Sequence, residues 1–128
     1  MRTILAALVL GVSAITTSAL AHDKPVKGPN GGQMIHIEDA HYELVAKDNT
    51  LTLFVSDNDN KPRASLDGAK ATATVLADGK TATVEMKPAT TDTLKGTGSF
   101  VAKAGLRVVV SIQEATRKPA QVRFTPAE

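Results

Sequence analysis

The chain contains no cysteine among its 128 residues. It therefore cannot form a disulfide, cannot use a thiolate nucleophile, and cannot carry the lipidated N-terminal cysteine of a bacterial lipoprotein. Tryptophan is also absent, and aromatic residues make up only 3% of the sequence. A folded core must therefore be built mainly from aliphatic side chains.

The chain also lacks a basic run. Lys and Arg number 15 against 13 Asp and Glu, and both signs are scattered along the sequence. Proteins that grip nucleic acid need clustered cations to neutralise phosphates, so we expect neither nucleic acid nor an acidic membrane surface as a partner. No Gly-x-Ser-x-Gly elbow and no complete phosphate-binding glycine pattern is present, so we do not expect an enzyme.

The longest apolar stretch lies at the N-terminus. Arg2 precedes an apolar stretch from Ile4 to Val12, and a Thr/Ser-rich stretch then leads to Ala19-Leu20-Ala21. This order is typical of a secretory signal peptide, and the apolar stretch is shorter than the roughly 20 residues that span a bilayer. We therefore expect removal of residues 1–21 and a mature chain of 107 residues that begins at His22. We expect this chain to have no membrane span and to be periplasmic, with secretion as the second choice.

The remainder of the chain has the pattern of a β protein. Val and Thr are abundant, turn residues recur about every eight to twelve positions, and no segment shows sustained helical spacing of apolar residues. We expect an all-β fold, an immunoglobulin-like antiparallel β-sandwich of about seven or eight strands over residues 33–128, preceded by a loop segment at 22–32. Besides two hairpins, strands are expected at 50–56, 98–103, 105–113 and 120–126.

The first hairpin is predicted over residues 70–88, KATATVLADGKTATVEMKP. Asp78-Gly79 forms a favourable two-residue turn, which places Ala77 opposite Lys80. In this register one face is mostly apolar, and a slip by one residue would expose it. The residues of that face are Ala71, Ala73, Val75, Ala82, Val84 and Met86.

The second predicted hairpin holds two of the three histidines. With Asp39-Ala40 as its turn, Glu38 is opposite His41 and His36 is opposite Glu43. Side chains alternate along a strand, so these four residues share one face. The opposite, core-facing side then carries Ile35, Ile37, Tyr42 and Leu44.

Imidazole and carboxylate groups are ligands for divalent copper, zinc, nickel or cobalt. His36, His41 and Glu43 are the main candidate ligands, with Glu38 and His22 as additional candidates. If the mature chain begins at His22, its free α-amine and ring nitrogen can chelate one metal together, as in a histidine brace. Two other interpretations stay open: Met34 is either a soft ligand for Cu(I) or a packing residue, and the hairpin face is either a metal site or a solvated surface of complementary charges.

A cluster of oxygen-bearing side chains follows the strand expected at 50–56. The segment SDNDNKP, residues 56–62, contains two Asp and two Asn. It lacks the glycine and glutamate positions of an EF-hand loop, so we interpret it as a turn rich in Asp and Asn.

Three motifs, GPNGGQ, HYELV and LTLFVSDNDNKP, resemble those of small, largely uncharacterised proteobacterial periplasmic proteins. Those proteins share a Gly-Pro-x-Gly-Gly opening, a His-x-Glu-Leu-Val strand and an Asp-rich loop before Lys-Pro. A similar opening occurs in periplasmic adaptor subunits of heavy-metal efflux pumps. The resemblance covers most of the mature chain, with its strongest motifs in residues 28–62. It implies a periplasmic β domain linked to metal homeostasis, and His41 and Glu43 match the motif, although the chain lacks the helical hairpin and lipoyl parts of an adaptor.

The sequence therefore predicts a periplasmic metal-binding accessory protein for copper, zinc or a similar divalent metal. Its chemistry would be capture and transfer of the ion, with a metal-efflux or other envelope protein as partner. The alternative is a non-catalytic structural or protein-interaction module that uses a sheet edge or a loop. Metal dependence distinguishes these two hypotheses.

Overall fold

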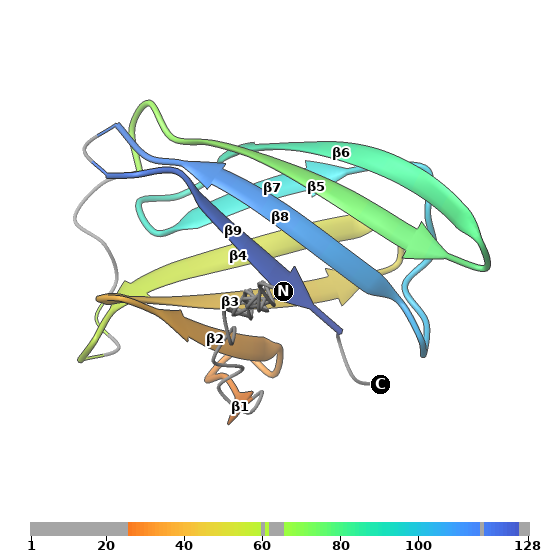
Figure 1. Cartoon of the computed structure of the whole chain (residues 1–128), viewed down its shortest axis with the longest axis horizontal. Helices are drawn as coiled ribbons and strands as arrows, with labels where there is room; N and C mark the ends of the chain where they lie inside the picture. The colour runs from red at the N-terminus through yellow and green to blue at the C-terminus, as the bar shows by residue number, and fades with distance from the viewer. Residues whose placement is uncertain (1–25, 60, 62–65, 116, 126–128) are drawn as a thin grey trace, which may run out of the picture.

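The computed structural model describes residues 26–59, 61, 66–115 and 117–125. Nine antiparallel strands occur in these residues, joined in one sheet of order β1-β2-β3-β4-β7-β6-β5-β8-β9 (Figure 1). The strands are β1 (Val26–Lys27), β2 (Gln33–Ile37), β3 (Ala40–Lys47), β4 (Thr50–Asp57), β5 (Lys70–Ala77), β6 (Lys80–Pro88), β7 (Thr93–Thr97), β8 (Arg107–Gln113) and β9 (Ala120–Phe124).

The sheet curls strongly into a half-barrel. Strand β6 joins its two halves, because residues 80–86 pair with β5 whereas Lys87 and Pro88 pair with β7. Figure 1 shows β2, β3 and β4 on one side of the curl and β5, β8 and β9 on the other. The curl brings β2 and β9, which are far apart in the order of the sheet, close to each other.

The core lies inside this curl and is aliphatic, as the composition predicts. Alternate residues of the central strands are buried, which is the pattern of a sheet with one face covered. Each buried Leu or Val side chain contributes roughly 1.5–3 kcal/mol relative to an exposed one. The largest fully buried side chains are Phe124, Leu44, Leu51, Leu53, Met86, Leu94, Leu106, Val55, Val75, Val84, Val108 and Val110.

The hairpin of β5 and β6 has the predicted register. Ala77 is opposite Lys80, and the pairing continues to Ala71 opposite Met86. Asp78 and Gly79 both have positive φ, 51° and 73°, which is the conformation that a tight turn between twisted strands requires. The expected apolar face of this hairpin is confirmed, since all its members except the partly exposed Ala82 are buried.

The all-β, antiparallel part of the fold prediction is confirmed, but the strands differ from those expected. Nine strands form one continuous sheet instead of the two separate sheets of a sandwich, because β6 spans both halves. Residues 98–103 are not a strand, although Phe100 is buried there. Two short strands, β1 and β7, take the count above the expected seven or eight.

The predicted signal peptide, residues 1–21, and His22 lie outside the described residues. Within the part of the chain that the structure describes, no helix is long and apolar enough to cross a membrane.

Candidate functional site

The turn between β2 and β3 lies one residue earlier than predicted. Glu38 and Asp39 form it, so Ile37 is opposite Ala40 and His36 is opposite His41. The expected pairs of Glu38 with His41 and of His36 with Glu43 are therefore wrong. The reason is Ala40, which is 1% exposed and belongs to the core face of β3. Moving the turn changes the opposing pairs but not which alternate residues share a face.

His36 and His41 are direct cross-strand neighbours on the outer face of the sheet. Their ring centroids are 4.6 Å apart, and the rings are nearly perpendicular, at 80°. His36 is exposed and His41 is half-buried. Solvent therefore reaches at least one imidazole of a pair in which the two rings touch.

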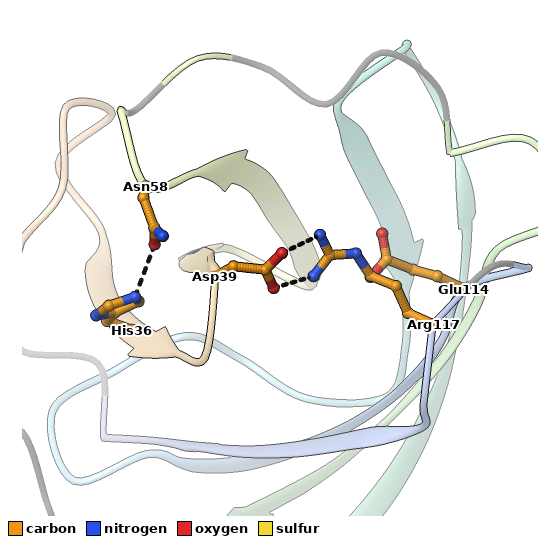
Figure 2. A network of polar contacts seen from close by, with 5 residues as sticks. All are labelled: His36, Asp39, Asn58, Glu114 and Arg117. Atoms are coloured by element: carbon orange, nitrogen blue, oxygen red, sulfur yellow. Dashed lines mark hydrogen bonds and ion pairs between the residues drawn. The ribbon is translucent and has the colours of Figure 1, made fainter.

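Asn58 orients the ring of His36. Its Oδ1 lies 2.8 Å from Nε2 of His36, a contact between β2 and the segment that follows β4 (Figure 2). A carbonyl oxygen only accepts hydrogen bonds, so Nε2 donates the proton. In the neutral ring, Nδ1 of His36 then keeps its lone pair.

Glu43 lies on the same outer face, but its carboxylate is engaged in hydrogen bonds with the loop that precedes β2. It is 3% exposed, and its carboxylate accepts hydrogen bonds from the backbone of the preceding loop. The amide of Asn30 donates to Oε1 at 2.7 Å and that of Gly32 at 3.1 Å, while Nδ2 of Asn30 donates to Oε2 at 2.9 Å. Both oxygens are therefore used to hold residues 28–32 against the sheet.

Gly28 allows the loop to lie this close. A Cβ atom at this position would overlap the carboxylate of Glu43. Two backbone bonds fold the loop on itself, from the Gly28 amide to Gly32 at 2.8 Å and from the Gly31 amide to Gly28 at 3.1 Å. The Gly-Pro-Asn-Gly-Gly motif and the glutamate of the HYELV motif thus form one structural unit.

The remaining candidate ligands are placed differently. Glu38 is an exposed turn residue with φ of 55°, off the strand face that carries the histidines. Met34 shares that face but is half-buried opposite Glu43. Among the described residues, no three His, Cys, Asp or Glu side chains are grouped so as to hold a metal ion. The structure therefore brings together His36 and His41 from the predicted set.

A second polar contact fixes the same turn from the other side. Arg117, between β8 and β9, forms a two-pronged ion pair with Asp39, in which Nη2 lies 2.7 Å from Oδ2 (Figure 2). Nε of Arg117 also lies 3.8 Å from Oε2 of Glu114. The hydrogen bond with Asp39 raises the pKa of Arg117.

No local pattern in the sequence predicts the contact of Asp39 with Arg117 or that of His36 with Asn58. Asp39 and Arg117 are 78 positions apart, and His36 and Asn58 are 22 apart.

Comparison with known protein families, with curated proteins and with solved structures finds no match for this chain. The resemblance to periplasmic proteins therefore stays a prediction.

Proposed function

We propose that this protein is an exported, non-catalytic metal-binding protein that captures a divalent copper or zinc ion with His36 and His41. The observation that supports the proposal is the direct cross-strand contact of the two imidazoles, whose ring centroids are 4.6 Å apart. Two nitrogen ligands from facing strands form a partial coordination shell, and water or a partner protein fills the other positions. An ion held in this way can be handed on, which suits a role in metal homeostasis or efflux.

Contacts around the pair support this assignment of roles. A metal-bound imidazole commonly donates its other ring N–H to a fixed acceptor, and Oδ1 of Asn58 is such an acceptor for His36. Glu43 fixes the loop at 28–32 instead of serving as a ligand, because its oxygens already accept the hydrogen bonds of that loop. Glu38 and His22 remain candidates for a third ligand, and the role of His22 requires that the mature chain begin there.

The test is a calorimetric titration of the mature protein with Cu²⁺ and with Zn²⁺ at neutral pH. We expect 1:1 binding that is weakened at least about tenfold, equivalent to about 1.4 kcal/mol, by either His36→Gln or His41→Gln. Glu38→Gln removes a carboxylate from the adjacent turn and leaves both imidazoles in place. A large loss in that variant would add Glu38 to the ligand set.

The alternative, a structural or protein-interaction module of the envelope, gives a different result. Its histidines are surface residues, so metal binding would be no tighter than about a millimolar or unchanged in both histidine variants. Circular dichroism of each variant checks that the sheet is intact, which separates loss of ligand from loss of fold. The metal proposal would be rejected by binding no tighter than about a millimolar, or by binding that is unchanged in both histidine variants.

A further inference from the structure

The outer edge of β9 has backbone groups without a ladder partner among the described residues. Among the nine described strands, β9 pairs with β8 only. The amide of Thr125, just beyond the strand, points away from β8 and donates to Oε1 of Gln33 at 2.6 Å. Backbone direction alternates along a strand, so the N–H and C=O groups of Gln121 and Arg123 face the same outer edge.

A groove of about 600 Å³ lies beside this edge, lined by residues of β5, β6, β8 and β9 and, from β2, by Gln33 and Ile35. Ile35, Leu76 and Val109 supply apolar surface in it, and Leu76 is 40% exposed. An unpaired strand edge next to apolar surface is the geometry to which an extended peptide adds as a further strand.

Two cations give the groove a positive charge. Arg107 and Arg123 line it and are exposed, and none of the acidic side chains that the structure describes lines it. Within the described residues, neither arginine forms a hydrogen bond or ion pair through its side chain. The groove thus offers two guanidinium groups whose natural partners are carboxylates.

We propose that the groove and the edge of β9 bind an extended acidic segment of a partner protein as an added strand. Side chains of such a strand alternate between the two faces of the sheet, as those of β9 do. Carboxylates at alternate positions would meet Arg123 and Arg107 on the outer face. Aliphatic residues between them would face the apolar side near Ile35. A second copy of this chain fits less well, because it would bring two more arginines to the same edge.

The test uses a fluorescein-labelled peptide of six residues, alternating valine and glutamate, and the mature protein in EDTA. EDTA makes the result independent of the proposed metal site. By fluorescence anisotropy we expect saturable binding that is weakened about tenfold by Arg107→Gln/Arg123→Gln, since two ion pairs with the peptide are lost. In spectra of ¹⁵N-labelled protein, the amide signals of Gln121 and Arg123 should shift.

Lys70→Gln/Lys87→Gln is the matched control, because both lysines are exposed on the same outer face and lie outside the groove. It removes the same charge and should change binding less than about twofold. Equal losses of peptide affinity in the arginine and lysine double variants would show that net charge alone causes the effect, which would overturn the proposal. So would absence of binding, equal binding of a valine–lysine peptide, or binding of dodecanoate without the peptide. A dimer in sedimentation that competes with the peptide would assign the edge to a second copy.

Discussion

At the residue scale, the carboxylate of Glu43 lies where a side chain on Gly28 would have to be. We expect Gly28→Ala to lower the free energy of unfolding by about 1–3 kcal/mol, the usual cost of forcing extra volume into a packed site. The φ of Gly28 is not positive, so the effect is steric and not conformational. Urea denaturation of the variant and the unmodified protein measures it.

A double-mutant cycle provides the control. In a Glu43→Ala background the overlapping carboxylate is gone, so Gly28→Ala should cost less than half as much as in the unmodified protein. The Glu43→Ala change itself should be destabilising, because it leaves the amides of Asn30 and Gly32 without their acceptor. Equal costs of Gly28→Ala in the two backgrounds would show that the loop does not rest on this carboxylate.

At the element scale, the turn between β2 and β3 carries local strain. Glu38 has a φ of 55°, in the left-handed region that Asn and Gly tolerate better than Glu. We expect Glu38→Asn to raise the free energy of unfolding by roughly 0.5–1 kcal/mol. Glu38→Gln removes the charge but keeps the conformational preference, so it should leave stability unchanged. A gain of equal size in both variants would point to charge and contradict the conformational explanation.

The hairpin of β5 and β6 and that of β2 and β3 show which features of the strands the sequence could predict. Asp78-Gly79 is a specific turn signal, and the register of β5 and β6 follows from it. Between β2 and β3 no glycine marks the turn, and only the burial of Ala40 decides between two placements. Strand β1 has two residues, too few for alternation to show.

The candidate site, too, could be predicted from the sequence only in part. Alternation along each strand was enough to place His36 and His41 on one face, because neither turn placement changes the faces. The contacts of His36 with Asn58 and of Asp39 with Arg117 depend on how the sheet curls, which periodicity does not encode. Burial of Glu43 under the loop also required the three-dimensional fold, since a glutamate beside two histidines resembles a ligand in the sequence alone.

At the scale of the whole molecule, the curled sheet is tied together where β2 and β9 meet, and the described residues show two such ties. Gln33 accepts the amide of Thr125 near one end of β2, and Asp39 pairs with Arg117 beyond the other end. These side-chain contacts replace a backbone ladder between the two strands, which are not neighbours in the sheet. The junction should therefore open more easily than the ladders of the central strands.

Arg117→Gln tests this view of the molecule. A partly exposed ion pair contributes up to about 1 kcal/mol, so global stability should fall only slightly. Local opening should increase more visibly, with amide exchange of Val122 and Phe124 in β9 faster by up to about fivefold and that of Val75 in β5 unchanged. Asp39 raises the pKa of Arg117, so the guanidinium stays charged at every pH below its ordinary pKa. The effect should therefore be the same at about pH 6 and about pH 9.

Lys118→Gln is the matched control for this variant, since Lys118 is an exposed cation next to Arg117. Its removal should leave exchange in β9 unchanged, and about 1 M salt should bring the unmodified protein close to the Arg117→Gln variant by screening the pair. If β9 exchanged no faster without Arg117, or if β5 and β9 accelerated together, the sheet would open as one unit and the ion pair would not hold its edges. Faster exchange confined to β9 would mean that β9 opens as a local unit and that its outer edge is released from β2.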